Sequence, residues 1–357
     1  MRRRASRRIR VGWVTVGGDA PVRVQSMTTT RTADAQATLA QIRSLAGVGC
    51  EIVRVAVPHE EDAAALGAIA GASPIPVVAD IHFRWRFALD ALEAGVHGLR
   101  LNPGTIGDRR RVAVIAREAK ARGVPIRIGV NAGSLDPELL RRYGAPTPEA
   151  LVESALRECA ALEEHGFTDL KVSVKAADVQ ACLEAYRALA AACAYPLHLG
   201  VTEAGPPPQG VVKSAVALGT LLLEGIGDTI RVSLTAPPEE EVVVGWEILK
   251  AVGLRRRGVE IVACPSCGRA EVDVFALTRA VQERAHELPE GIKVAVMGCP
   301  VNGPGEARGA HVGIAAGRRQ GVLFVGGRAV GRFREEELVD ALVEAARSVR
   351  PDGKEGA

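Results

Sequence analysis

The feature that most constrains the fold is a regular alternation of short β-rich runs with helical segments. Eight β-rich runs follow one another, at Val22–Met27, Glu51–Val57, Pro76–His82, Gly98–Asn102, Pro125–Asn131, Leu170–Lys175, Leu197–Thr202 and Thr229–Leu234. Segments with helical spacing of apolar residues lie between them, for example Ala33–Leu45, Pro148–His165 and Ala177–Ala192. Thr147 and Pro148 are suited to the N-cap and first position of the second of these helices. Eight strand–helix repeats predict an α/β fold, a (β/α)₈ TIM barrel.

The segment before the barrel divides into two parts. Residues 1–8 are rich in arginine and are expected to form a disordered basic tail. No apolar run follows them, so they are not expected to be a secretory signal. Residues 9–27 are expected to form a β-hairpin that turns at Gly17-Gly18-Asp19. Its second arm would continue as the first barrel strand.

The chain changes character after Leu254-Arg255-Arg256-Arg257-Gly258, which reads as a hinge whose charges are solvated. Beyond it, short strands are expected at 259–264, 292–297, 311–315 and 321–330, and helices at Glu271–Glu287 and Arg334–Val349. We therefore expect a barrel domain at 1–255 and a smaller α+β domain at 256–357.

Composition excludes several classes of function. Apolar residues make up 47% of the 357 residues, which is ample for a large core, yet no run is long enough to span a membrane. The net charge of +3 and the 3% aromatic content argue against a general nucleic-acid surface. Seven cysteines at irregular spacing do not suggest a disulfide framework, so we expect a reducing cytoplasm.

Polar and charged residues gather where the predicted barrel strands end. Active sites of TIM barrels lie at the C-terminal ends of the strands, and residues spaced by two point to the same side of a strand. The set comprises Arg54, Asp80, His82, Arg100, Asn102, Arg127, Asn131, Lys175, Thr202, Glu203, Arg231 and Ser233. Five cations at one mouth predict a substrate that carries phosphate or diphosphate, because guanidinium groups match phosphate oxygens. No Walker loop is present, so a nucleotide is not specifically indicated.

Two residues of this set have open roles. Glu203 is suited to donate or accept a proton, or it balances the charge of an arginine. His82 is a candidate site residue, although a single histidine of this kind is most often a hydrogen-bonded residue of the core.

Three cysteines in the smaller domain form a second candidate site. Cys264 and Cys267 are separated by two residues, and Cys299 follows on a glycine- and proline-rich stretch that is expected to be a loop and also carries Glu306. Thiolates select zinc, copper(I) or iron–sulfur clusters. Three thiolates and one exchangeable oxygen donor would leave a position open to substrate.

The chain resembles the 4-hydroxy-3-methylbut-2-enyl diphosphate synthase family in its short bacterial form, along nearly its whole length. The matching motifs are Val24–Thr28, Asp80–Phe83, Arg100–Gly104, Pro125–Leu135, His198–Gly205, Glu224–Leu234 and both cysteine motifs. The resemblance implies reductive ring opening of 2-C-methyl-D-erythritol 2,4-cyclodiphosphate, an oxidoreductase reaction of isoprenoid biosynthesis by the methylerythritol phosphate pathway. It also implies electrons from flavodoxin or ferredoxin and a head-to-tail homodimer.

The resemblance assigns roles to the candidate residues. It implies a 4Fe–4S cluster held by Cys264, Cys267, Cys299 and Glu306. A diphosphate cradle is implied for Arg54, Arg100, Arg127, Asn131, Lys175 and Ser233, to which we add Asn102, Thr202 and Arg231 from their place at the mouth. Glu203, with His82 and Asp80 near it, would form the acid/base side.

Two other functions are compatible with the residues alone. One is a zinc-dependent phosphoester hydrolase on a TIM barrel, with the three cysteines and Glu306 as zinc ligands. The other is an iron–sulfur redox sensor whose basic tail touches nucleic acid, which the modest charge and scarce aromatics disfavour. Metal analysis distinguishes the first from an iron–sulfur enzyme, and nucleic-acid binding at low salt tests the second.

Overall fold

The computed structural model describes residues 2–82, 84–101, 106, 108–299 and 301–350. The chain divides into two compact units, Met1–Arg255 and Arg256–Ala357. Each has its own hydrophobic core, one filling the barrel and the other lying against the smaller sheet. None of the helices in the described part of the chain is long and apolar enough to cross a membrane.

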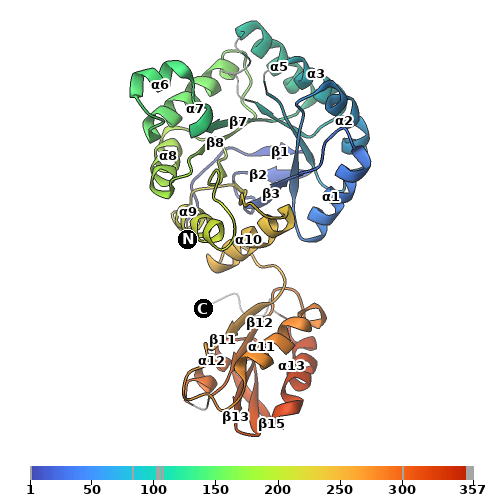
Figure 1. Ribbon diagram of the computed structural model, residues 1–357, viewed down its shortest axis with the longest axis vertical. Helices are drawn as coiled ribbons and strands as arrows, with labels where there is room; N and C mark the ends of the chain where they lie inside the picture. The colour runs from blue at the N-terminus through green and yellow to red at the C-terminus, as the bar shows by residue number, and fades with distance from the viewer. Residues whose placement is uncertain (1, 83, 102–105, 107, 300, 351–357) are drawn as a thin grey trace. The chain divides into compact units, whose positions relative to one another are not determined.

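The first unit is a parallel eight-stranded barrel, which confirms the predicted fold class (Figure 1). Its strands are β3 (Arg23–Met27), β4 (Ile52–Ala56), β5 (Val77–Asp80), β6 (Gly98–Leu101), β7 (Ile126–Asn131), β8 (Leu170–Lys175), β9 (His198–Leu199) and β10 (Thr229–Ile230). They pair in the order β8-β7-β6-β5-β4-β3-β10-β9. A parallel bridge between Val172 and Leu197 joins β8 to the start of β9 and closes the ring.

Helices follow the strands and cover the outside of the barrel (Figure 1). Those with given bounds are α1 (Ala35–Gly47), α2 (Glu60–Ala72), α3 (Arg86–Glu93), α5 (Arg109–Arg122), α6 (Pro137–Tyr143), α7 (Pro148–Glu163), α8 (Val179–Ala192), α9 (Gln209–Leu223) and α10 (Pro238–Ala251). The start of α7 is as predicted, with Pro148 in its first turn and the Thr147 hydroxyl accepting from Ala150 N at 3.3 Å.

The N-terminal hairpin differs from the prediction. Strands β1 (Ile9–Val11) and β2 (Val14–Val16) pair with each other, and the chain turns at Gly12, whose φ of +57° favours glycine. The hairpin therefore does not turn at Gly17-Gly18-Asp19, and β3 is a separate barrel strand. Ile9, Val11 and Val16 pack with Ile52 and Val78. The hairpin thus plugs the N-terminal end of the barrel and leaves the opposite end for chemistry.

The arginine-rich start is also not the free tail that was expected. Arg4 N donates to Gly225 O at 2.9 Å, and Arg3 forms an ion pair with buried Asp228 at 3.1 Å. The Arg4 guanidinium donates to the carbonyl of Cys193 at 2.6 Å. These hydrogen bonds and the ion pair tie the segment to the loops that precede β9 and β10.

The second unit is a five-stranded mixed sheet with helices. Its strands are β11 (Glu260–Ala263), β12 (Lys293–Met297), β13 (Val312–Gly317), β14 (Gln320–Val325) and β15 (Arg328–Arg334), paired in sequence order. Strands β11, β12 and β13 are parallel, and the last two pairings are antiparallel. Its helices are α11 (Val274–Glu283), α12 (Gly303–Arg308) and α13 (Leu338–Arg347).

Three further expectations for this region were wrong. Residues 321–330 do not form one strand but a β-hairpin, because Gly326 and Gly327 take φ of +54° and +79° and turn the chain. Glu306 lies in the helix α12, where a loop was expected. Arg255 is not simply solvated, since its guanidinium contacts Glu51 at 2.6 Å and lies over the ring of Trp246.

Candidate active site

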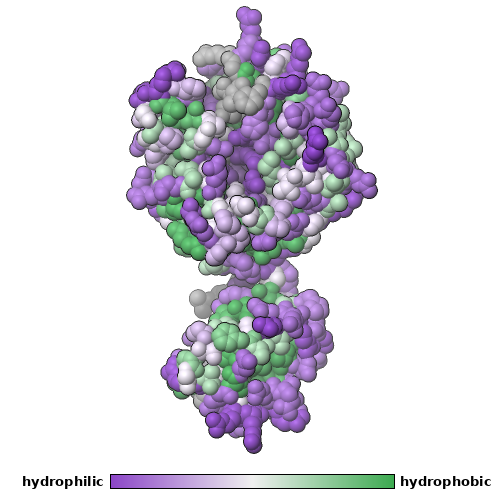
Figure 2. Space-filling model, in the orientation of Figure 1, coloured by the Kyte–Doolittle hydropathy of each residue, from purple (hydrophilic) through white to green (hydrophobic). Residues whose placement is uncertain are grey.

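A cavity of about 440 Å³ opens at the C-terminal ends of the barrel strands. Figure 2 shows hydrophilic side chains gathered in the hollow at the centre of the barrel face. The lining residues are Arg54, Asp80, His82, Arg100, Arg127, Asn131, Ala132, Gly133, Ser134, Lys175, Ala177, Thr202, Glu203, Arg231 and Ser233. Every described residue of the predicted barrel set lies here, although the strands that carry them are far apart in sequence. Asn102 lies outside the described residues.

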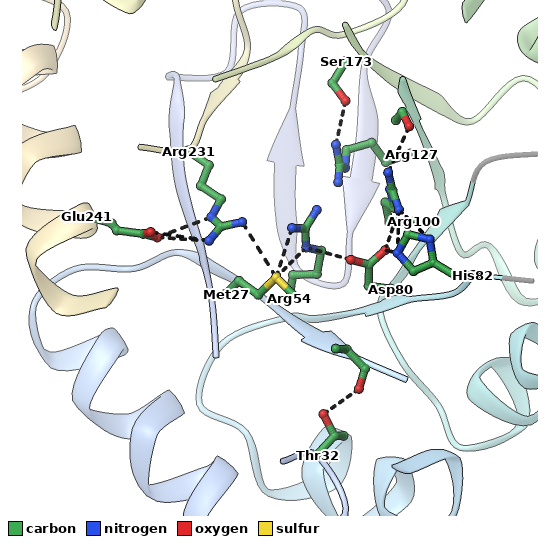
Figure 3. Close-up of polar contacts among 12 residues, drawn as sticks. Met27, Thr32, Arg54, Asp80, His82, Arg100, Arg127, Ser173, Arg231 and Glu241 are labelled. Carbon is green, nitrogen blue, oxygen red and sulfur yellow. Dashed lines mark hydrogen bonds and ion pairs between the residues drawn. The ribbon is translucent and has the colours of Figure 1, made fainter. Parts of the chain in front are cut away.

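Asp80 lies between two arginines on the floor of this cavity (Figure 3). Its carboxylate is 3.4 Å from Arg54 Nε and 3.1 Å from Arg100 Nη1, and His82 Nε2 lies 3.3 Å away. Burial alone would raise the pKa of Asp80, but Arg54 and the hydrogen bond with His82 outweigh it and hold the pKa well below its usual range. Asp80 is therefore a fixed negative charge that orients two cations, and it is not suited to be a proton donor.

Arg100 is fixed on three sides and still keeps unused hydrogen-bonding capacity. It contacts Asp80, it donates to Gly129 O at 3.0 Å, and its Nη1 is 2.8 Å from His82 Nε2. Its buried Nε makes no hydrogen bond within the described structure. A Cβ at residue 129 would lie only 2.7 Å from that Nε, so any larger residue there would displace the guanidinium.

Arg127 and Lys175 are buried cations with few partners. Arg127 Nη1 donates to Ser173 Oγ at 2.6 Å, while its Nε has no partner among the described residues. Burial, and then the neighbouring arginines, lower the pKa of both groups well below the ordinary values. Lys175 Nζ forms no hydrogen bond or ion pair with any described side chain, and Gly200 leaves room for it, because a Cβ there would lie 2.4 Å away. Cations held this way favour a bound anion.

Arg231 is held by a residue that the sequence interpretation missed. Glu241, buried in the first turn of α10, contacts the Arg231 guanidinium at 3.3 Å and also accepts from Leu234 N at 3.0 Å and Ser26 Oγ at 3.1 Å. In the sequence this carboxylate looks like an ordinary first-turn acid of a helix. Ser173 and Met27, which also contact the arginines, lack charge and gave no signal either.

The rim of the cavity contains Glu203 and a tight turn. Glu203 is exposed and has a φ of +52°, a conformation that costs energy for a residue with a Cβ and is typical of functional sites. The 3₁₀ turn Ala132–Ser134 directly follows Asn131 and brings three small residues to the lining. These small residues keep the entrance wide enough for a ligand to reach the cations.

The three predicted cysteine ligands lie at or beyond the C-terminal edge of the parallel strands of the second unit. Cys264 follows β11, and its N–H donates to Val296 O at 3.1 Å, while Cys299 follows the adjacent β12 and is 8% exposed. Backbone N–H groups of Asn302 and Val301 lower the pKa of the Cys299 thiol. The backbone N–H and the guanidinium of Arg269 lower the pKa of exposed Cys267. Both sites favour the thiolate, the form that binds metal.

Among the described residues, no group of three or more histidine, cysteine, aspartate and glutamate side chains is arranged to hold a metal ion. The three cysteines are nevertheless soft donors of the kind that zinc and iron–sulfur clusters select, and two of them have a lowered pKa. Glu306 is exposed in α12. This helix begins at Gly303, directly after Val301 and Asn302, whose backbone N–H groups donate to the Cys299 sulfur.

Comparison with known proteins covers both units. The GcpE TIM-barrel domain matches residues 6–246, and the GcpE protein C-terminal domain matches residues 260–348. The 4-hydroxy-3-methylbut-2-en-1-yl diphosphate synthase (flavodoxin) of Frankia casuarinae is 60% identical over 96% of this chain and 90% of its own length. A protein of Streptomyces avermitilis with that name and the suffix 1 is 58% identical over 97% of this chain and 90% of its own length.

A solved structure shows the barrel fold in a distant protein. The 3-dehydroquinate dehydratase from Geobacillus kaustophilus aligns with a TM-score of 0.51 at 16% identity, over 70% of this chain and 99% of its own. The residue ranges of the two family models include both cysteine motifs and all the strands that line the cavity. The chain therefore belongs to the GcpE family of 4-hydroxy-3-methylbut-2-en-1-yl diphosphate synthases.

Proposed function

We propose that the chain converts 2-C-methyl-D-erythritol 2,4-cyclodiphosphate to 4-hydroxy-3-methylbut-2-enyl diphosphate, an oxidoreductase step of isoprenoid biosynthesis. Among the structural observations, the cation-lined cavity supports this most directly. Arg54, Arg100, Arg127, Lys175 and Arg231 line a space of about 440 Å³, a size suited to a small cyclic diphosphate. The names of the relatives give the product of the reaction that we propose for this cavity.

The barrel residues bind and orient the substrate. Guanidinium forks and the Lys175 ammonium hold the diphosphate oxygens, and this remote binding energy positions the carbon skeleton. Asn131, Thr202 and Ser233 would supply uncharged hydrogen bonds to the same ligand, and Asn102 is proposed for that role from its motif. Asp80 and His82 keep Arg100 in place throughout, as their contacts at 3.1 and 2.8 Å indicate.

The reaction takes up two electrons and one proton. The C–O bond of the ring breaks and its oxygen stays on the diphosphate with the electron pair, the hydroxyl of the neighbouring carbon leaves as water, and a C=C bond forms between the two carbons. Glu203 at the rim is the proposed proton donor, because it is the exposed carboxylate of the lining. The electrons would come from an iron–sulfur cluster, since no side chain can provide them. We propose a 4Fe–4S cluster held by Cys264, Cys267, Cys299 and Glu306.

The electron donor is proposed to be flavodoxin, the word that the names of the relatives carry, with ferredoxin as the other candidate from the resemblance. A cytoplasmic location stays a prediction, in line with seven free cysteines.

The decisive experiment is anaerobic purification followed by optical and spin-resonance spectra and turnover of the cyclodiphosphate with a chemical reductant. Cys264→Ser should lose the cluster signal and activity, whereas Cys193→Ser, at a half-buried cysteine of the barrel unit, should keep both. Arg100→Ala and Lys175→Ala should weaken substrate binding and leave the spectrum unchanged. Absence of iron and sulfide in active wild-type protein would overturn the proposal, and zinc in their place would favour a hydrolase.

We also propose that the protein acts as a head-to-tail homodimer, as the family resemblance implies. Mixing a Cys264→Ser chain with a Glu203→Gln chain should then restore part of the activity. One of the two sites in such a mixed dimer would combine the intact Glu203 of the first chain with the intact cysteines of the second. Exchange of subunits without any recovery would mean that each chain uses its own cysteines.

A further inference from the structure

Met27 lies between two of the cavity arginines and contacts both (Figure 3). It is the last residue of β3, opposite Arg54 in the register with β4. Its sulfur lies 3.2 Å from Arg54 Nε, 3.0 Å from Arg54 Nη2 and 3.7 Å from Arg231 Nη1. Both arginine side chains are largely buried, with 13% and 17% exposed. The thioether therefore accepts hydrogen bonds from two guanidinium groups that repel each other.

The contacts on either side make this arrangement unusual. Arg54 faces Asp80 on its other side, and Arg231 faces Glu241. Along the row that runs from Glu241 to Arg100, acid and cation alternate except between Arg54 and Arg231, where a neutral sulfur occupies the position that a carboxylate would fill. Methionine is a weak and polarisable acceptor, so it holds the direction of an N–H group without cancelling its charge.

We propose that Met27 is a positioning residue that fixes Arg54 and Arg231 without placing an anion between them, so that a phosphate group of the substrate supplies the negative charge at this position. The inference rests on the proposed diphosphate substrate and adds the part of the site that orients it. Burial lowers the pKa of Arg54 to about 10 against the opposing effect of Asp80, and the Arg231 charge lowers it further.

Three substitutions separate orientation from charge. Met27→Gln supplies a neutral oxygen acceptor, Met27→Leu keeps the volume without an acceptor, and Met27→Glu supplies an acceptor that neutralises the pair. We expect the affinity for pyrophosphate to be highest for wild type and Met27→Gln, lower for Met27→Leu and lowest for Met27→Glu. A hydrogen bond to a charged group corresponds to about tenfold in affinity, so Met27→Leu should bind pyrophosphate about tenfold more weakly than wild type does. Met27→Glu should bind it more weakly still.

Affinity is measured with inorganic pyrophosphate by calorimetry on the full-length, cluster-free chain at one fixed salt concentration. Val216→Glu on α9, at a 50% exposed side chain, adds the same charge outside the cavity and should leave the affinity unchanged. Thermal unfolding of each variant checks that the fold is kept. In turnover assays, Met27→Leu and Met27→Glu should raise KM far more than they lower kcat.

The outcomes separate this inference from the proposed function. If wild-type protein binds no pyrophosphate, the diphosphate cradle itself is wrong. If wild type binds and Met27→Leu binds equally well, or Met27→Glu binds as tightly as Met27→Gln, only the role of Met27 is refuted.

Discussion

At the scale of single residues, Arg231 depends on one buried carboxylate. Glu241 is 5% exposed and makes contacts with Arg231, Leu234 N and Ser26 Oγ. Removing one partner of a buried ion pair leaves the other charge uncompensated. We expect Glu241→Gln to lower the free energy of unfolding by about 3 kcal/mol, as measured by urea titration.

The matched control for this change is an exposed pair. Glu60 contacts Arg84 at 3.2 Å, but their side chains are 80% and 60% exposed. Exposed pairs contribute little, so Glu60→Gln should change the free energy of unfolding by less than about 1 kcal/mol. Equal losses for Glu241→Gln and Glu60→Gln would contradict a special role for the buried carboxylate.

Glu158 is a buried carboxylate whose replacement by glutamine should stabilise the protein, in contrast to that of Glu241. It is 7% exposed in α7, its Oε2 has no partner among the described residues, and burial raises its pKa to about 8. At a pH between 4.5, the ordinary pKa of a glutamate, and about 8, Glu158 keeps its proton in the folded protein but has lost it in the unfolded chain. This contribution to stability is complete below 4.5 and is lost as the pH rises through about 8.

Glu158→Gln should therefore stabilise the protein at pH 8 by roughly 2–4 kcal/mol, and the gain should shrink as the pH falls toward 4.5. Urea titrations of both proteins at several pH values measure the difference. A difference that does not change with pH would show that Glu158 is ionised in the folded protein.

At the scale of elements, the sequence predicts what depends on local period and misses what depends on tertiary register. The strands carrying Arg54, Asp80 and Arg127 were predictable because short buried β-branched runs that include a charged residue are local patterns. The convergence of these residues then follows from the barrel. Met27, Glu241 and the space beside Gly200 could not be predicted, since each matters only through a neighbour on another strand or helix.

The N-terminal segment illustrates the same limit. A run of arginines reads as a free tail, because nothing in the sequence marks the carbonyls that receive it. In the structure, the Arg4 guanidinium donates to carbonyls of Ala190 at 3.3 Å and Cys193 at 2.6 Å, and to that of Tyr195. These carbonyls lie at and beyond the end of α8, where partners within the helix run out.

Arg4→Met should accordingly lower the free energy of unfolding by about 2 kcal/mol, since it removes charged hydrogen bonds and keeps the apolar stem. Arg10→Met, at an exposed position of β1, should change it by less than about 0.5 kcal/mol. Urea titrations of the two variants decide the matter, and equal effects would restore the view of a free basic tail.

At the scale of the whole molecule, the chain holds two separate cores. Sixty or so residues of the barrel unit form one apolar cluster, and the second unit has its own, centred on residues such as Val294, Ile314 and Leu342. The cavity lies in the first unit, and the three candidate cluster ligands Cys264, Cys267 and Cys299 lie in the second. Ligands of the two sites should therefore stabilise different units.

We expect calorimetric unfolding of the cluster-free chain to show two transitions. A ligand that binds only the folded barrel stabilises it by about 2.7 kcal/mol at a concentration of a hundred times Kd. Pyrophosphate should therefore raise the barrel transition alone, and Lys175→Ala should reduce that rise. Anaerobic reconstitution with iron and sulfide should raise the other transition, and Cys264→Ser should abolish that effect without changing the response to pyrophosphate. If either ligand shifts both transitions equally, or only one transition is seen, the two units unfold as one and the cores are not independent.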